Sequence, residues 1–182
     1  EFLIDVILQK KLSIKNVLEL GTGSGAIILS LLTENKNLKA VATDISYEAI
    51  YMAKKNAILN NVENRVQFIC CNWLESFVNL KFDLIISNPP YIKTKDIVNL
   101  EPEVNKNDPL IALDGGFNGL QEYSKICTSI KKIKQNNLAV LFEIGHEQAT
   151  SVASIMKKNN FVEIEVFKDY EKNDRCIFGI SI

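Results

Sequence analysis

The sequence is poor in metal-ligating side chains and lacks the long apolar runs that cross membranes. It has one histidine and four cysteines among 182 residues, and no two cysteines form a CxxC pair. Structural zinc sites need clustered ligands, so we expect no metal ion. We interpret the four cysteines as buried, reduced thiols: Cys70, Cys71, Cys127 and Cys176. No stretch of about 18 apolar residues is present, so no membrane-spanning helix is expected, and no signal peptide is visible.

Neither sign of charge dominates the chain. Lysine and arginine together number 21, aspartate and glutamate 22, and the net charge is −1. A surface built to grip DNA or RNA usually carries an excess of positive charge, so this balance argues against a dedicated nucleic-acid-binding protein. Hydrophobic residues make up 47% of the sequence, and a chain of this length can bury a full core as one domain. We therefore treat residues 1–182 as a single domain.

Apolar strand patterns alternate with helical patterns along the chain. Strands are expected at 16–20, 39–43, 65–71, 82–87, 138–144, 161–167 and 176–181. Helices are expected at 2–12, 26–34, 120–133, 147–158, and from Ser46, a good N-cap, towards Asn60. This alternation predicts an α/β fold, in which a mostly parallel sheet is covered by helices on both faces. The polar turn between the last two strands predicts that the final strand is antiparallel, and 92–116 is predicted to be an irregular loop.

Three glycines with the spacing G-x-G-x-G follow the first strand and open a helix. They are Gly21, Gly23 and Gly25, with Thr22 and Ser24 between them. Glycine lets the backbone turn sharply and lets a ligand approach closely, and the helix that follows offers unpaired N–H groups. The dinucleotide-binding fingerprint has a different spacing, G-x-G-x-x-G. By itself the turn fits either a ligand site of another kind or a tight strand–helix connection.

Polar residues also end the second and third strands. Asp44 follows the glycine turn by about 20 residues, where an acidic side chain can accept both hydroxyls of a ribose and would repel a 2′-phosphate. Asn72 and Trp73 follow the third strand, at the same edge of the sheet. We expect Asn72 to accept from the exocyclic amine of an adenine, and Trp73 to stack on or border that ring; alternatively, Trp73 only caps the core. The pattern predicts a nucleoside ligand with a free ribose, such as S-adenosylmethionine.

The segment Asn88-Pro89-Pro90-Tyr91 directly follows the fourth strand. Proline removes a backbone donor and keeps the preceding residue extended, so two prolines leave carbonyl groups free of strand pairing. The side-chain oxygen of Asn88 and the carbonyl of Pro89 can then hold the two N–H groups of a planar NH₂, against which Tyr91 can pack. Such a grip would catalyse methyl transfer mainly by positioning. Asn88, Pro89 and Tyr91 are therefore candidate catalytic residues, and all four are candidate substrate-binding residues; the alternative is a rigid turn without a ligand.

With these motifs in view, the chain resembles the catalytic domain of the bacterial release factor glutamine methyltransferases over essentially its whole length. The matching segments are 19–25 (ELGTGSG), 87–92 (SNPPYI), 100–104 (LEPEV), 112–120 (ALDGGFNGL), 143–145 (EIG) and 168–179 (KDYEKNDRCIFG). The N-P-P-Y motif is shared with adenine-N6 and guanine-N2 methyltransferases, whereas the loop at 100–123 is much more specific to this family. Two positions depart from the family pattern, because Asn72 and Asn118 each stand where the family usually has aspartate.

The resemblance implies a Rossmann-like, S-adenosylmethionine-dependent methyltransferase with a seven-stranded sheet. It would methylate the side-chain amide nitrogen of the glutamine in the Gly-Gly-Gln motif of peptide chain release factors. The implied cofactor contacts are Gly21, Thr22, Gly23, Ser24, Gly25, Asp44, Asn72, Trp73 and Asn88. We expect a cytoplasmic monomer with a release factor as partner, and no membrane or direct nucleic-acid partner. The family also carries an amino-terminal helical domain, which we expect to precede this chain in a longer protein.

Two other functions stay open at this point. A nucleic-acid amino-methyltransferase would present the same N-P-P-Y geometry to adenine N6 or guanine N2. A non-catalytic cofactor-binding module would keep the glycine turn and Asp44 without transferring a methyl group. Around the site, Glu143 either borders the ligand or only ends a strand, and Asp169, Asp174 and Arg175 are expected to fix the last hairpin.

Overall fold

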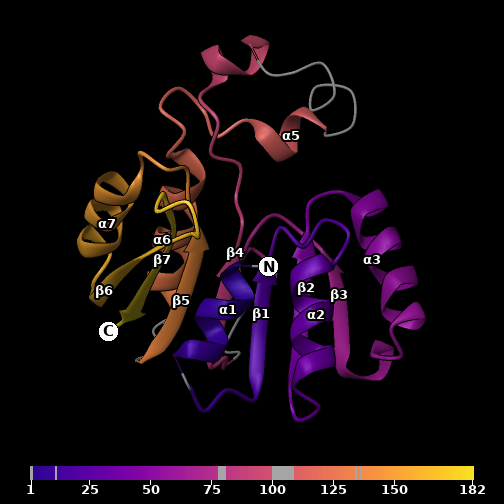
Figure 1. Ribbon diagram of the computed structural model, residues 1–182. Helices are drawn as coiled ribbons and strands as arrows, with labels where there is room; N and C mark the ends of the chain where they lie inside the picture. Colours follow the sequence, from indigo (N-terminus) through magenta and orange to yellow (C-terminus); the bar gives the residue numbers. More distant parts are fainter. Residues whose placement is uncertain (1, 11, 78–80, 100–108, 134, 136) are drawn as a thin grey trace.

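The computed structural model describes residues 2–10, 12–77, 81–99, 109–133, 135 and 137–182. These residues form a seven-stranded sheet with helices on both faces (Figure 1). The strands in chain order are β1 (Asn16–Leu20), β2 (Lys39–Asp44), β3 (Val66–Cys70), β4 (Leu84–Ser87), β5 (Leu138–Glu143), β6 (Phe161–Lys168) and β7 (Asp174–Ser181). Across the sheet their order is β3-β2-β1-β4-β5-β7-β6.

The strand directions confirm the predicted fold class. β1 to β5 pair in parallel, whereas β7 runs antiparallel to both β5 and β6. The chain builds outward from β1 to β3 and then returns to place β4 on the other side of β1. The carboxyl ends of β1 and β4 therefore meet where the strand order reverses, which is the usual ligand site of an open α/β sheet.

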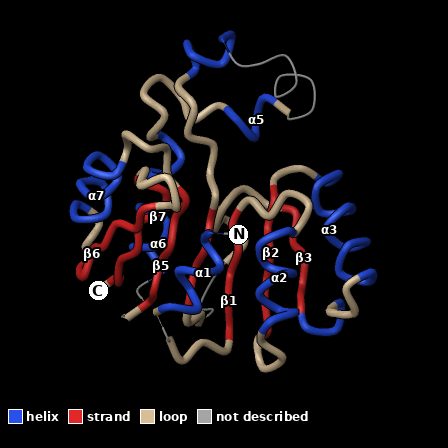
Figure 2. The backbone as a smooth tube through the Cα atoms, in the orientation of Figure 1, coloured by secondary structure: helices blue, strands red, loops and turns tan. Residues whose placement is uncertain are grey.

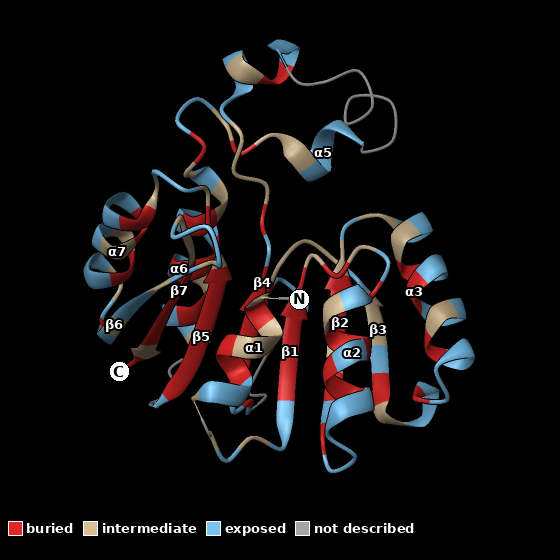
Figure 3. Ribbon diagram, viewed as in Figure 1, coloured by how far each residue is buried: buried red, intermediate tan, exposed pale blue. Residues whose placement is uncertain are grey.

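Helices cover the sheet on its two faces. The longer ones are α1 (Phe2–Gln9), α2 (Ala26–Glu34), α3 (Tyr47–Leu59), α6 (Gln121–Ile133) and α7 (Ala149–Lys158). α1, α2 and α3 contribute to a first core cluster, and α6 and α7 to a second. In β4, Leu84 and Ile86 join the first cluster and Ile85 the second, which is why this strand is a continuous apolar run. Figure 3 shows the central strands buried over most of their length. Among the described helices, none combines the length and the apolarity of a membrane span.

Element boundaries differ from the sequence prediction at a few ends. The first helix ends earlier than predicted, and the fourth strand begins at Leu84 rather than at 82. The third strand begins at Val66 because the preceding residues form the 3-10 helix η1 (Glu63–Arg65). Ser46 caps α3 as predicted, since its hydroxyl accepts the N–H of Ala49 at 3.1 Å.

The interpretation of the cysteines as buried thiols is wrong for two of the four. All four are free, and Cys127 in α6 and Cys176 in β7 are buried. Cys70 is exposed, however, and Cys71 is only partly buried. Cys70 ends β3, an edge strand of the sheet, and an edge strand has a neighbouring strand on one side only.

A long segment between β4 and α6 projects beyond the carboxyl ends of the strands (Figures 1 and 2). We call residues 92–119 the arm. The prediction of an irregular loop at 92–116 is incomplete, because the arm contains the 3-10 helix η2 (Thr94–Asn99) and the short helix α5 (Leu110–Leu113). The LEPEV segment at 100–104 lies outside the described residues. The described part of the arm stands over the ligand edge of the sheet.

Candidate functional site

A pocket of about 1030 Å³ opens at the carboxyl ends of β1, β2, β3 and β4. Most residues proposed from the sequence to hold a ligand line it: Gly21, Gly23, Ser24, Asp44, Asn72, Trp73, Asn88 and Pro90. Its other walls come from the start of α3, from α5 and from the start of α6. Four residues proposed from the sequence do not line it: Thr22, Gly25, Pro89 and Tyr91. The pocket nevertheless joins the glycine turn and the segment after β4 in one site.

The glycine turn has a left-handed backbone where it meets the pocket. Gly21 and Gly23 have φ angles of 70° and 55°, a region in which residues with a side chain are strained. A Cβ on Gly21 would lie 3.3 Å from the ring of Trp73, so packing limits this position. A Cβ on Gly23 would meet no atom within 4 Å, and this open side suits the close approach of a ligand.

Two backbone N–H groups hold the carboxylate of Asp44. Its Oδ2 accepts from Gly23 at 2.8 Å, and its Oδ1 accepts from Ser46 at 2.9 Å. Each carboxylate oxygen has a second lone pair, and Asp44 lines the pocket. Both oxygens can therefore accept from the two neighbouring hydroxyls of a ribose, as the sequence position of Asp44 predicts.

Glu19 carries a buried carboxyl group beneath the turn, and the sequence pattern predicted no role for it. It is 1% exposed and accepts a hydrogen bond from the hydroxyl of Thr22. Burial raises the pKa of Glu19 from 4.5 to about 8; the Thr22 hydroxyl and the N–H of Ile28 oppose this rise, and the charge of Asp44 adds to it. Thr22 also donates its N–H to the carbonyl of Thr43 at 2.8 Å. Thr22 thus makes its hydrogen bonds beneath the turn rather than at the pocket. The sequence feature that could have indicated the contact between Thr22 and Glu19 is a glutamate inside an apolar strand.

Side-chain hydrogen bonds also fix Asn72 and Trp73, which come shortly after the end of β3. Asn72 donates its amide N–H to Glu75 at 2.8 Å, and the other end of an amide is an oxygen that accepts. Trp73 packs against the second core cluster, and its indole N–H donates to Glu122 of α6 at 2.8 Å. Trp73 therefore caps the core and lines the pocket at once. Sequence reasoning missed Glu122, because no short-range pattern connects positions 49 residues apart.

The Asn88-Pro89-Pro90-Tyr91 segment leaves the sheet directly beside the glycine turn. Ser87 ends β4 and pairs with Leu20, which ends β1. The Ser87 hydroxyl donates to the Leu20 carbonyl at 2.7 Å, so the two strand ends are tied together. Within the segment, Asn88 is exposed and lines the pocket, whereas Pro89 is buried. Asn88 thus forms part of the pocket wall.

Tyr91 lies beside the pocket rather than in it, which differs from the expected packing against a bound acceptor. Its ring packs against the second core cluster. Burial raises the pKa of Tyr91, the charge of Glu143 raises it further, and the guanidinium of Arg175 opposes both. Burial also raises the pKa of Glu143, again opposed by Arg175. Tyr91, Glu143 and Arg175 therefore form one polar cluster, and Glu143 does not line the pocket.

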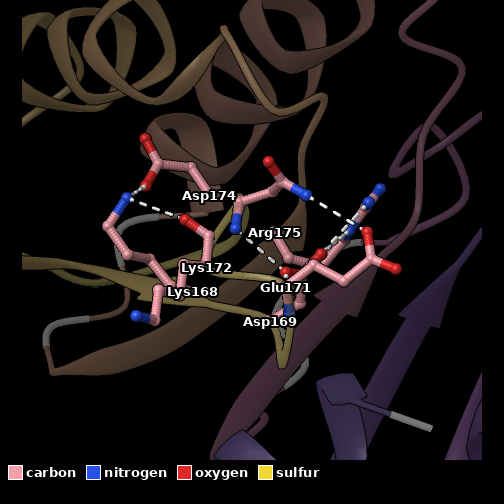
Figure 4. A network of polar contacts seen from close by, with 7 residues as sticks. Lys168, Asp169, Glu171, Lys172, Asp174 and Arg175 are labelled. Atoms are coloured by element: carbon pink, nitrogen blue, oxygen red, sulfur yellow. Dashed lines mark hydrogen bonds and ion pairs between the residues drawn. The ribbon is translucent and has the colours of Figure 1, made fainter.

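Arg175 lies at the start of β7, directly after the turn that joins β6 to β7, and this turn holds a network of polar contacts (Figure 4). Asp169 accepts the N–H groups of Glu171 at 3.0 Å and Asn173 at 2.9 Å. Asp169 also pairs with the guanidinium of Arg175 at 3.3 Å. As predicted, these side chains fix the last hairpin, and Arg175 in addition connects that hairpin to Tyr91.

The arm returns to the body through a glycine-rich loop that packs on the backbone of Pro90 and Tyr91. A Cβ on Gly115 would lie 2.8 Å from the Pro90 carbonyl oxygen and from the Cα of Tyr91. Gly119 has a φ of 71° and no room for a Cβ beside the Tyr91 carbonyl. Gly115 also donates its N–H to Ile92 at 2.8 Å. The glycines of the ALDGGFNGL motif therefore permit the close approach that holds the segment after β4.

Three features together define the class of the protein: the strand order, the antiparallel β7, and a pocket between a G-x-G-x-G turn and an acidic strand end. This class is the S-adenosylmethionine-dependent methyltransferases of Rossmann-like fold. A solved methyltransferase from Pyrococcus furiosus has this fold, with a TM-score of 0.69 and 18% identity over 98% of this chain and 81% of that one. The model of the methyltransferase small domain matches residues 1–103. The chain belongs to the methyltransferase small domain family.

Two curated relatives are similar over most of the chain. The release factor glutamine methyltransferase of Agrobacterium fabrum is 41% identical over 161 residues, which are 88% of this chain and 55% of that protein. The bifunctional methyltransferase of Rickettsia bellii is 40% identical over 176 residues, 96% of this chain and 32% of that protein. The chain thus spans about half the length of the first relative and a third of the second. The resemblance inferred from the motifs is confirmed.

S-adenosyl-L-methionine is the cofactor of this class, and the residues of the pocket fit it. Asp44 offers two acceptors for the ribose hydroxyls, and Gly23 leaves open space at the turn. Ile45 and Met52 line the pocket with apolar side chains that are 51% and 50% exposed, so they offer an apolar wall to an adenine ring. Sequence reasoning missed both, although an apolar residue directly after an acidic strand end is a signal that could have found Ile45.

Proposed function

We propose that the chain transfers a methyl group from S-adenosyl-L-methionine to the side-chain amide nitrogen of the glutamine in the Gly-Gly-Gln motif of peptide chain release factors. The observation that carries this proposal is the exposed Asn88 at the pocket wall, directly beside the glycine turn. The name of the Agrobacterium fabrum relative supports a glutamine acceptor.

Asn88 would hold the acceptor amide at the pocket wall, and the carbonyl of the buried Pro89 would complete this site once the release factor is bound. The side-chain oxygen of Asn88 and the carbonyl of Pro89 each accept one N–H of the glutamine NH₂ group, which orients the nitrogen towards the cofactor end of the pocket. Positioning of this kind is worth up to ~7–11 kcal/mol in well-oriented systems. When bound, the cofactor supplies an electrophilic methyl group on a sulfonium centre. As the N–CH₃ bond forms and the S–CH₃ bond breaks, the nitrogen gains positive charge and both acceptor oxygens hold it more strongly. One N–H proton of the amide then leaves to water, so no strong base is needed before transfer.

Tyr91 and Pro90 would complete the acceptor site. Pro90 lines the pocket beside Asn88. The ring of Tyr91 packs against the second core cluster, and its phenol stays neutral, because its pKa is raised. A neutral phenol avoids placing a second negative charge near Glu143. We assign Tyr91 the role of packing against the plane of the glutamine amide once the release factor is bound.

A nucleic-acid amino-methyltransferase is the main alternative, because the same grip would hold adenine N6 or guanine N2. The charges around the pocket disfavour a polyanion. Among the residues that the structure describes, its wall carries four carboxylates and one cation: Asp44, Glu48, Asp114, Glu122 and Lys125. Phosphate backbones are bound through an excess of cationic side chains, so the pocket mouth favours a protein substrate.

The test incubates the chain with a release factor and S-adenosyl-L-methionine and reads the mass of the proteolytic peptide that contains Gly-Gly-Gln. We expect a gain of one methyl group on the glutamine. Asn88→Ala should abolish the gain while S-adenosylhomocysteine still binds. Asn37→Ala is a matched control, because Asn37 is exposed in the loop between α2 and β2, at the opposite edge of the sheet. Methylation of RNA or DNA without methylation of glutamine would overturn the proposal in favour of the alternative.

The proposed substrate also indicates where in the cell the enzyme acts. Release factors act where proteins are synthesised, so we propose a cytoplasmic enzyme that meets its partner there. The relatives are longer than this chain, and we propose that an amino-terminal helical domain helps to hold the release factor. The methylation assay therefore tests the 182-residue chain by itself and, separately, together with the proposed amino-terminal domain.

A further inference from the structure

The single tryptophan of the chain is held by a side chain from another wall of its pocket. Trp73 is the only tryptophan among 182 residues. Its ring lies against the glycine turn, where a Cβ on Gly21 would be 3.3 Å away. Its indole N–H donates to Oε2 of Glu122 at 2.8 Å, and Oε1 of Glu122 accepts from Lys125 at 2.7 Å. All three side chains line the pocket.

The backbone conformation of Trp73 is unfavourable, so side-chain contacts are needed to hold the residue in its position. Its φ is 44°, in the left-handed region that residues with a side chain rarely adopt. An indole N–H at a partly buried site requires an acceptor. The Glu122 side chain is only 13% exposed, so water competes little for its oxygens. Lys125 engages the second oxygen, which fixes the orientation of the carboxylate.

We propose that Glu122 is a positioning residue of the cofactor site, which holds the indole of Trp73 as the pocket wall against which S-adenosyl-L-methionine binds. Glu122 acts on the cofactor through Trp73. The proposal depends on the assignment of the pocket to this cofactor, not on the identity of the methyl acceptor. The same turn of α6 also holds the arm, because Gln121 donates its N–H to the Gly115 carbonyl at 3.1 Å.

The test titrates the 182-residue chain with S-adenosylhomocysteine and records both the heat of binding and the fluorescence of Trp73. Glu122→Ala removes the acceptor, so we expect Kd to rise about tenfold and the emission to shift with lower anisotropy. Glu122→Gln keeps an acceptor for the indole, and its Kd should stay within about threefold of the wild type. Glu147→Ala is the matched control, because this carboxylate is 81% exposed and lies outside the pocket lining.

A second pair of variants isolates the hydrogen bond itself. Trp73→Phe keeps a ring but has no N–H, so Glu122→Ala should add no further loss of affinity in that background, as measured by calorimetry. Equal losses in Glu122→Gln and Glu122→Ala would overturn the proposal, as would unchanged affinity in Glu122→Ala or additive losses in the double variant. Absence of binding to the wild-type chain would also overturn it. S-adenosylhomocysteine has no methyl group to transfer, so a failure of glutamine methylation leaves this result standing.

Discussion

The side-chain amide of Gln148 donates to the backbone carbonyl of Tyr91 at 3.0 Å. The same nitrogen donates to the carbonyl of Gly119 at 3.1 Å, and the amide oxygen accepts the N–H of Gly145 at 3.1 Å. One side chain before α7 therefore ties together the segment after β4, the glycine loop of the arm and the end of β5. The proposed acceptor grip owes its rigidity to these contacts as well as to its two prolines.

Gly119→Ala should destabilise the fold and disturb Tyr91. A Cβ at this position would overlap the Tyr91 carbonyl and lie 2.8 Å from the amide nitrogen of Gln148. A left-handed backbone costs a residue with a side chain roughly 1–2 kcal/mol, and the overlap adds to this. We expect the free energy of unfolding to fall by about 2–4 kcal/mol, measured by urea denaturation followed through Trp73 fluorescence.

Gly23→Ala is the matched control for that prediction. Gly23 also has a positive φ, of 55°, but a Cβ there would meet no atom within 4 Å. It should therefore cost only the backbone strain, while weakening cofactor binding at the open side of the turn. Equal losses of stability in the two variants would show that the contact between Gly119 and Tyr91 does not matter.

The parts of the site that the sequence predicted are those with a short-range signal. The glycine turn and Asp44 each follow a strand at a recognisable spacing, and Asn88 heads a motif with two prolines. Their convergence follows from the strand order, because β1 and β4 are neighbours and their carboxyl ends share one edge. Asn88 and Asp44 could thus be assigned to one site before any distance was known.

The missing parts are contacts between residues that are distant in sequence. Trp73 meets Glu122, and Tyr91 meets Arg175, across segments that no helical or strand period connects. The sequence also did not show which residues of the glycine turn are buried. Thr22 stands between two glycines that line the pocket, yet its hydroxyl donates to Glu19 beneath them. Tertiary packing decides such cases, and local pattern carries no information about it.

Glu19 should make the stability of the protein fall as pH rises. Its pKa in the folded protein is about 8, against 4.5 for the free side chain. Below 4.5 both states hold the proton; between these values the folded protein keeps it and the unfolded chain releases it. The unfolded state then binds fewer protons, so stability decreases with pH, by at most about 1.4 kcal/mol per pH unit. Urea unfolding across this range should show the decrease in the wild type.

Glu19→Gln should remove that part of the pH dependence, because an amide has no proton to release in this range. The variant should therefore gain stability relative to the wild type as pH rises towards 8. Glu147→Gln, at an exposed site, is the control and should keep the wild-type slope. Identical slopes for wild type and Glu19→Gln would mean that Glu19 ionises in the folded protein as it does in water.

Arg175→Met should slow methyl transfer while leaving cofactor binding intact. Arg175 opposes the charge of Glu143 beside the phenol of Tyr91, so its loss should raise the pKa of Tyr91 further and release the ring from the hairpin. We expect kcat to fall about tenfold or more, because misplacement of an acceptor-holding group is costly. The Kd for S-adenosylhomocysteine should stay within about threefold, since Arg175 does not line the pocket.

Lys168→Met separates this effect from a general loosening of the hairpin. Lys168 at the end of β6 pairs with Asp174 at the start of β7 at 2.6 Å, and the Lys168 side chain is 61% exposed, so its loss should cost little. Methyl transfer by this variant should match the wild type. If Lys168→Met and Arg175→Met slow the reaction equally, the hairpin as a whole supports the site and the contact of Arg175 with Tyr91 has no separate role. If only Arg175→Met slows it, the guanidinium positions Tyr91 for the reaction.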